Sequence, residues 1–295
     1  MSNTDNTHGG TAAVRWAVIK YGGAAMEGNY SEEMFAEELL ALAEGGITPV
    51  VVHGGGAEMT RMAAAMGIEA EFVAGQRRTD ARMLEVVVMV LAGSINKNLV
   101  RAIQSAGGNA VGLCGVDNAL LVARKLGGDA GDLGFVGEVT AVNTRFLSLL
   151  CDGGMIPVIA PVGLGDGGEL YNINADLAAA AVAGALGAEM LVYMSNIPGV
   201  EVDGAVVPTL SRAEAEGLIE RGTIRGGMIP KVTSAFEALE AGAASVRIID
   251  GRTPGALRGL LAGDGVGTAI VRGGSSDTMD IQRQATISSL EGVLT

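Results

Sequence analysis

The sequence predicts an α/β protein built on a buried, largely parallel β-sheet. One strand, Val50-Val51-Val52-His53, runs directly into Gly54-Gly55-Gly56. A continuous β-branched run without polar alternation is typical of a strand buried on both faces, as in parallel sheets. Expected helices at 31–43 and 57–66 flank this strand, and strands and helices alternate along most of the chain. That alternation is the pattern of βαβ units.

The other elements follow from the same reading of hydrophobic period and turn residues. Strands are expected at 14–21, 156–161, 190–194, 245–249 and 268–271, with a shorter one at 110–113, and residues 117–125 and 135–142 should form an antiparallel hairpin. Helices are expected at 81–93, 96–105, 147–153, 177–186, 210–221 and 232–241, and the polar residues 1–13 should be disordered.

Length and composition limit the kinds of protein that this chain can be. Its 295 residues suit one large α/β domain or two lobes that share a sheet. The net charge of −13 argues against nucleic acid and anionic membranes as partners. No apolar run reaches the roughly 18 residues of a membrane span, and residues 1–11 lack the apolar segment of a signal peptide. We expect a cytoplasmic protein in which Cys114 and Cys151 are reduced thiols.

Gly54-Gly55-Gly56 brings backbone N–H groups to the start of a helix, which suits an anionic ligand. The same glycines also fit a simple tight turn between strand and helix, shaped in part by His53. Lys20 stands at the carboxyl end of the first strand, the edge of an open α/β sheet where ligands bind. A solvated strand terminus is the alternative reading of this lysine.

Polar residues after later elements could serve the same site. Arg77 and Arg78 suit a carboxylate or phosphate, or else a solvated helix start. Asn172, Asn174 and Asp176 follow at a spacing of two, so all three would project to one side of an extended segment, with Asp176 as the alternative N-cap of the next helix. Lys231 is expected at a helix start, where a bound anion would offset the unfavourable helix dipole.

Five motifs in this chain occur in the order and spacing of the amino-acid kinase family. They are Lys20-Tyr21-Gly22-Gly23, His53-Gly54-Gly55-Gly56, Gly75-Gln76-Arg77, Asn172-Ile173-Asn174-Ala175-Asp176 and Gly227-Met228-Ile229-Pro230-Lys231. An ordered set of motifs is more specific than any single glycine turn. The chain resembles this family over residues 14–271, and within it most resembles the acetylglutamate kinases. It has no GxxxxGK[ST] phosphate loop.

The resemblance implies a three-layer αβα sandwich with a mainly parallel central sheet. An N-terminal lobe, 14–185, would bind the acyl acceptor and dimerise, and a C-terminal lobe, 186–272, would bind ATP, followed by an extension at 273–295. A homodimer or higher homo-oligomer is expected, with the apolar helix at 81–93 as the interface.

The resemblance also implies a role for each motif residue. Lys20 and Lys231 would stabilise the transferring phosphoryl group, and Asp176 would orient both lysines. Substrate contacts would come from the backbone of Gly55 and Gly56 and from the side chains of Arg77 and Asn172, and nucleotide contacts from Gly22, Gly23, Asn196, Gly199 and Gly227. Mg²⁺ would be held through the nucleotide phosphates rather than by protein ligands.

The implied reaction is ATP-dependent phosphorylation of the side-chain carboxylate of N-acetyl-L-glutamate to an acyl phosphate, in arginine biosynthesis. This acceptor is ionised at neutral pH, so it needs no general base. Positioning and charge neutralisation remain, and lysines, backbone amides and a nucleotide-bound Mg²⁺ supply both.

Three departures from the pattern leave alternatives for the substrate. Ser195-Asn196 stands where an aspartate is usual, Arg78 where a valine is usual, and Cys114-Gly115-Val116-Asp117-Asn118 differs from the usual turn. The serine–asparagine pair resembles kinases that act on glutamate or aminoadipate linked to an acidic carrier protein, which Arg77, Arg78 and Arg82 could bind. A non-catalytic amino-acid sensor of the same fold is the second alternative, although a sensor has no need of both lysines.

Overall fold

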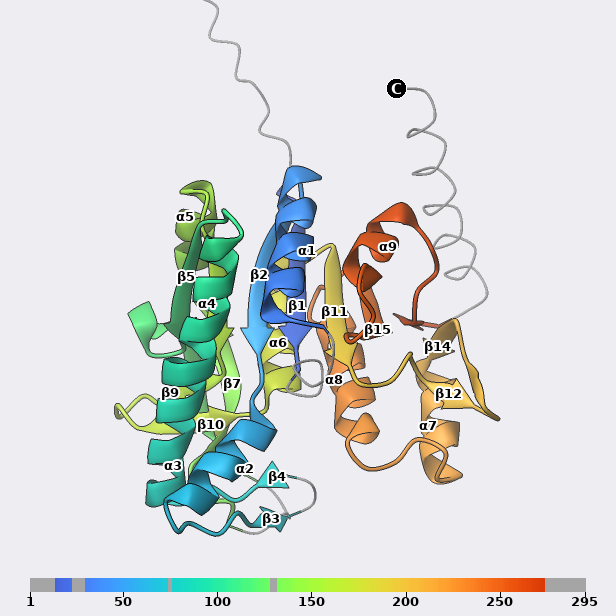
Figure 1. The fold of residues 1–295 in the computed structure, drawn as a ribbon. Helices are drawn as coiled ribbons and strands as arrows, with labels where there is room; N and C mark the ends of the chain where they lie inside the picture. The colour runs from blue at the N-terminus through green and yellow to red at the C-terminus, as the bar shows by residue number, and fades with distance from the viewer. Residues whose placement is uncertain (1–13, 23–29, 74–75, 128–131, 274–295) are drawn as a thin grey trace, which may run out of the picture.

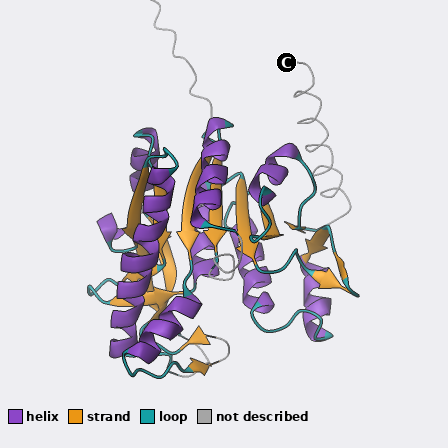
Figure 2. Cartoon of the chain, in the orientation of Figure 1, coloured by secondary structure: helices purple, strands orange, loops and turns teal. Residues whose placement is uncertain are grey.

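The computed structural model describes residues 14–22, 30–73, 76–127 and 132–273. The expected tail at 1–13, Gly23, and all but the first residue of the expected extension at 273–295 lie outside these residues, as do Gly128 and Gly131 of the hairpin loop. The chain forms a central β-sheet with helices on both faces, which confirms the predicted αβα sandwich (Figures 1 and 2).

The central sheet has eight strands, and β1 lies near its middle. Every neighbouring pair is parallel except β15 and β16, as expected of a mainly parallel sheet. Across the sheet the order is β14 (Thr209–Ser211), β16 (Thr268–Val271), β15 (Val246–Asp250), β11 (Met190–Ser195), β1 (Trp16–Tyr21), β2 (Thr48–His53), β8 (Ile156–Ala160) and β5 (Ala110–Cys114). Strand β1 therefore joins the early part of the chain to the late part.

Helices of two groups cover the two faces of this sheet, and each group shares its own apolar core. On one face lie α5 (Thr144–Asp152), α6 (Ala175–Leu186), α7 (Arg212–Glu220) and α8 (Met228–Glu240). On the other lie α1 (Glu32–Glu44), α2 (Gly56–Ala65), α3 (Ala81–Val87), α4 (Asn96–Ser105) and α9 (Ala256–Ala262).

Strand β1 sends alternate residues to these two cores. Trp16 and Val18 pack with α6 and α8, whereas Ala17, Ile19 and Tyr21 pack with α1 and the other helices of the opposite face. Because side chains alternate along a strand, Lys20 shares the side of Trp16 and Val18. The lysine therefore points to the face covered by α6 and α8.

The helices expected at 81–93 and 96–105 are one continuous helical run. Between α3 and α4 the chain forms a π-helix, η2 (Val88–Ile95), with no break. This run, Ala81–Ser105, is long and apolar enough by length and composition to cross a membrane. Its residues Val87, Leu91 and Leu99 are buried in the core of the domain, as in a core helix.

A second, closed sheet stands beside the central one. It consists of β10 (Leu170–Ile173), β7 (Val136–Val142), β6 (Leu121–Lys125) and β9 (Val162–Leu164). Strands β6 and β7 form the predicted antiparallel hairpin, but Asp117–Ala119 is a 3₁₀ turn, η3, rather than part of a strand. Two small hairpins complete the described chain, β3 (Phe72–Val73) with β4 (Gln76–Arg77) and β12 (Glu201–Val202) with β13 (Ala205–Val206).

Candidate active site

A cavity of about 250 Å³ lies at the carboxyl end of β1 and β2. Its wall combines Lys20, the turn Gly54–Gly56, Arg77, Asn172 and Asp176. These residues come from β1, the β2–α2 turn, the β3–β4 hairpin, the second sheet and α6. In Figure 1, α2 and the β3–β4 hairpin lie below the carboxyl ends of the central strands.

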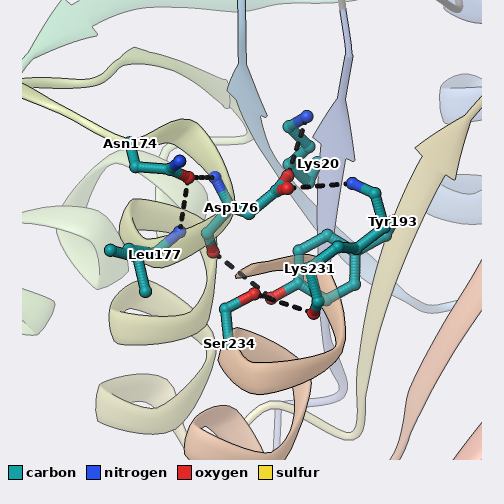
Figure 3. Close-up of polar contacts among 7 residues, drawn as sticks. All are labelled: Lys20, Asn174, Asp176, Leu177, Tyr193, Lys231 and Ser234. Carbon is teal, nitrogen blue, oxygen red and sulfur yellow. Dashed lines mark hydrogen bonds and ion pairs between the residues drawn. The ribbon is translucent and has the colours of Figure 1, made fainter. Parts of the chain in front are cut away.

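A buried carboxylate between two lysines forms the charged centre of the site (Figure 3). Asp176 Oδ1 lies 2.8 Å from Lys20 Nζ, and Asp176 Oδ2 lies 2.9 Å from Lys231 Nζ. All three residues are at most 9% exposed. Three buried charges with a net positive sum can accept an anion without leaving a charge unpaired.

The pKa shifts agree with this arrangement. Burial alone would raise the pKa of the Asp176 carboxyl, but the ammonium groups of Lys20 and Lys231 outweigh burial and lower it. Burial, together with the charge of Lys20, lowers the pKa of Lys231, and Asp176 opposes that shift. The carboxylate therefore stays ionised and holds both lysines close together.

Local hydrogen bonds explain why Asp176 stands where it does. Asn174 is the N-cap of α6, because its side-chain oxygen accepts hydrogen bonds from the N–H groups of Asp176 and Leu177 at 2.8 and 3.3 Å. The alternative reading, in which Asp176 caps this helix, is therefore wrong, and the segment is not extended as far as residue 176. Since α6 begins at Ala175, Asp176 lies in its first turn with its carboxylate free to pair with the lysines.

The buried side chains of His53 and Asn96 hold the glycine turn through hydrogen bonds. His53 Nδ1 lies 3.0 Å from the carbonyl oxygen of Gly54, which can only accept, so Nδ1 carries the proton. His53 Nε2 then accepts from Asn96 Nδ2 at 3.2 Å. Burial, aided by the charges of Lys97 and Lys20, lowers the pKa of His53 to about 4. A neutral histidine thus sets the direction of the Gly54 carbonyl, in agreement with its expected role in shaping the turn.

Close packing explains why residue 55 is glycine. A Cβ at this position would collide with Ile95 Cδ1 and lie 2.7 Å from Leu91 Cδ2, both in η2. The β2–α2 turn thus rests directly on the π-helix.

Arg77 is held at the opposite wall of the cavity. Its Nη2 donates to the Gly56 carbonyl at 3.0 Å and to Thr60 Oγ1 at 2.7 Å, and its guanidinium stacks 4.7 Å from the centre of the Phe72 ring. Among the described residues, its buried Nη1 has no partner. A carboxylate in the cavity would satisfy this nitrogen.

The neighbouring arginine faces the other way. Arg78 Nη1 pairs with Glu71 at 2.8 Å, on the protein surface. Arg77 is only 8% exposed, whereas Arg78 and Arg82 are exposed on the surface.

A family model described as the amino acid kinase family matches residues 15–250. The chain belongs to the amino acid kinase family. Relatives within it include the acetylglutamate kinases of Chlorobaculum tepidum, 48% identical over 86% of this chain and 89% of the relative, and of Syntrophobacter fumaroxidans, 49% identical over 86% and 90%.

Solved structures of similar fold include the N-acetylglutamate synthase of Neisseria gonorrhoeae in complex with coenzyme A and N-acetyl-glutamate. Its TM-score is 0.77 at 30% identity, over 88% of this chain and 60% of that longer chain. The carbamate kinase of Giardia lamblia bound to AMP-PNP has a TM-score of 0.64 at 20% identity, over 88% of this chain and 99% of that chain. The second likeness supports the amino acid kinase fold alone.

The structure gathers most of the family motifs at this one site. Lys20, Gly55, Gly56, Arg77, Asn172 and Asp176 line the cavity, and Lys231 reaches Asp176 from α8. Of the expected nucleotide contacts, Gly22, Asn196, Gly199 and Gly227 are absent from the cavity wall, and Gly23 lies outside the described residues.

Sequence reasoning missed several polar residues that support the family motifs. Thr60 fixes Arg77, and Thr79 Oγ1 accepts from Asn172 Nδ2 at 3.0 Å. Tyr193 and Ser234 lie beneath the charged centre. Thr60, Thr79 and Ser234 each bond a carbonyl within four residues in the sequence, whereas Tyr193 bonds only distant residues.

Proposed function

We propose that this chain transfers the γ-phosphoryl group of ATP to the side-chain carboxylate of N-acetyl-L-glutamate, a reaction of arginine biosynthesis. The observation that carries the proposal is the Lys20–Asp176–Lys231 centre, which stands beside a glycine turn and faces a cavity of small-molecule size. The acetylglutamate kinases that match most of the chain support the same reaction.

The charged centre and the turn act on the transferring group. As the phosphoryl group passes from ATP to the acceptor, Lys20 and Lys231 neutralise the charge on its oxygens, while Asp176 keeps the two lysines at a fixed spacing. The N–H groups of Gly55 and Gly56 add donors at the start of α2, where the helix dipole favours an anion. None of these groups has to accept a proton, since the acceptor carboxylate is already ionised.

Arg77 and Asn172 hold the acceptor. The buried Nη1 of Arg77 binds the α-carboxylate, and the Asn172 amide, fixed by Thr79, hydrogen-bonds the same end of the molecule. ATP occupies the side of Asp176 nearer Lys231, with Asn196, Gly199 and Gly227 around the nucleotide. Mg²⁺ is carried by the nucleotide phosphates.

The same proposal assigns the two lobes, the assembly and the compartment. Residues 14–185 bind the acceptor and residues 186–272 bind ATP. Two copies associate through α3 and η2, where the apolar side chain of Met89 is 48% exposed. Light scattering of the wild type and of Met89→Lys should give a dimer and a monomer, respectively.

The chain works in the cytoplasm, consistent with Cys114 and Cys151, which are both free thiols.

Trapping of the acyl phosphate with hydroxylamine tests the reaction directly. The protein is incubated with ATP and Mg²⁺ and with N-acetylglutamate, glutamate or aminoadipate in parallel. We expect hydroxamate from N-acetylglutamate alone, and none from the Lys231→Ala variant. If no free acid yields hydroxamate while ATP still binds, the proposed acceptor is wrong and a carrier-linked substrate or a sensor takes its place.

A further inference from the structure

Two buried hydroxyl groups lie directly beneath the charged centre and take no part in the proposed phosphoryl transfer. Tyr193, on β11, has its hydroxyl 3.2 Å from the backbone carbonyl of Asp176 and 2.9 Å from Ser234 Oγ. Ser234 Oγ lies 3.0 Å from the backbone carbonyl of Lys231. Both residues are completely buried (Figure 3).

These contacts close a ring through the two residues of an ion pair. Above, the side chains of Asp176 and Lys231 meet at 2.9 Å. Below, the backbones of the same two residues are joined through Ser234 and Tyr193. The tyrosine O–H donates to the Asp176 carbonyl, and the serine O–H donates to the tyrosine oxygen or to the Lys231 carbonyl.

Tyr193 also lies beside Lys20 in the sheet and close to the ammonium group of Lys231. In the central sheet Tyr193 is the direct register partner of Lys20 on β1. The Lys231 ammonium lies 5.1 Å from the centre of the Tyr193 ring, within the range of a cation–π contact. One side chain therefore touches or adjoins all three charged residues.

We propose that Tyr193 and Ser234 are positioning residues that fix the spacing of Lys20, Asp176 and Lys231 while the phosphoryl group is transferred. The inference rests on the proposed kinase reaction. A phosphoryl group between the lysines competes with Asp176 for both ammonium groups, so the side-chain ion pairs weaken during the reaction. The hydroxyl bridge joins backbone groups and carries no charge, so it keeps α6 and α8 in place when the ion pairs weaken.

The environment of Tyr193 suits such a role. Burial, together with the nearby Asp176 carboxylate, raises the pKa of the Tyr193 hydroxyl well above its usual value. The group therefore keeps its proton and remains a donor at every pH at which the enzyme would work.

Single-atom deletions test the bridge. Tyr193→Phe removes one hydroxyl, Ser234→Ala removes the other, and alanine suits the interior of α8. The matched control is Tyr30→Phe, which removes a buried tyrosine hydroxyl that bonds Glu38 at 3.0 Å on the opposite face of the sheet. For each protein, kcat and both KM values are measured by hydroxamate formation, with the melting temperature as a measure of folding.

We expect Tyr193→Phe and Ser234→Ala each to lower kcat by about tenfold to a hundredfold, the effect of a small misplacement of reacting groups, with KM values within about twofold. The double variant should be no slower than the slower single variant, because either deletion opens the ring. Tyr30→Phe should keep the wild-type kcat even where its melting temperature falls as much as that of Tyr193→Phe.

Three results would overturn the inference: a wild-type kcat in both single variants, an equal loss of kcat in Tyr30→Phe, or independent, multiplying losses in the double variant. If Tyr193→Phe does not fold, Ser234→Ala decides alone. A wild type that makes no hydroxamate would instead refute the proposed reaction, so the two failures are distinguishable.

Discussion

At the scale of single residues, the buried positive charges of the site outnumber its buried carboxylates. Lys20 and Lys231 share one carboxylate, and Arg77 keeps a buried nitrogen without a partner among the described residues. Burying an unsatisfied polar group costs about 1–3 kcal/mol, more if it is charged. In the proposed reaction, the carboxylate of the acceptor and the phosphoryl group of ATP together would satisfy both places.

Replacing Arg77 with lysine should separate substrate binding from catalysis. An ammonium group has its three donors on one nitrogen and cannot reproduce the fork in which Nη2 bonds Gly56 and Thr60 while Nη1 stays available for a carboxylate. We therefore expect the KM for N-acetylglutamate to rise about tenfold to a hundredfold, as for the loss of a charge-assisted hydrogen bond. The KM for ATP should stay within about twofold. Arg78→Lys is the control, since Arg78 pairs with Glu71 on the surface; equal effects of the two substitutions would contradict the role of Arg77.

Replacing Lys231 with alanine should remove catalysis and spare nucleotide binding. Asp176 retains Lys20 as a partner, so no carboxylate is left buried alone. We expect kcat to fall by roughly two to four orders of magnitude, as when a group that stabilises the transition state is deleted. Calorimetry should find the affinity for ATP within about tenfold of the wild type. A kcat near the wild-type value would exclude Lys231 from the mechanism.

At the scale of elements, the β2–α2 turn and the π-helix η2 form one packed unit. A Cβ at Gly55 would force the side-chain ends of Leu91 and Ile95 to shift, whereas a Cβ at the adjacent Gly56 would meet nothing within 4 Å. π-Helical turns often lie at functional sites. Here η2 packs directly against the β2–α2 turn.

The packing predicts that alanine lowers the melting temperature at Gly55 but not at Gly56. Gly55→Ala should lower the melting temperature by several degrees, as an overpacked site costs about 1–3 kcal/mol. Gly56→Ala should leave the melting temperature nearly unchanged. Adding Ile95→Val to Gly55→Ala should restore part of the loss, because valine lacks the Cδ1 atom that collides with the new methyl group. Equal melting temperatures for Gly55→Ala and the wild type would show that η2 does not support the turn.

At the scale of the whole molecule, His53 makes the stability of the fold depend on pH. Its pKa is about 4 in the folded protein and 6.5 ordinarily, so the unfolded chain binds more protons between these values. Stability is therefore complete above about pH 6.5 and falls as the pH drops toward 4. Linkage gives a loss of about 2 kcal/mol between pH 7 and pH 5.

Urea unfolding at pH 7 and pH 5 measures this loss. His53→Gln should show a smaller loss, because glutamine does not titrate. NMR of the histidine ring protons gives the pKa of His53 itself, and the chain contains 2 histidines. A His53 pKa near 6.5 would contradict the buried, neutral imidazole.

Much of the fold and the site could be predicted because its signals are local. The buried strand before Gly54 and the helices expected at 31–43 and 57–66 each depend on only a few neighbouring residues, and the structure confirms them. The sequence left Asp176 as an alternative cap of α6 because Asn174 and Asp176 are both good capping residues. Tyr193 was missed because its partners, Asp176 and Ser234, lie far away in the sequence. Ser234 was missed because a serine that bonds the carbonyl three residues earlier reads as an ordinary residue of a helix.

The central place of β1 in the sheet has a consequence for how the protein is made. The ribosome delivers Lys20 at the beginning of synthesis, but the partners of β1 arrive at intervals: β2 soon, β11 late, and Lys231 of α8 later still. Domains fold as units once their segments have emerged. A nascent chain that ends before α8 lacks Lys231, so the Lys20–Asp176–Lys231 centre is completed only late in synthesis.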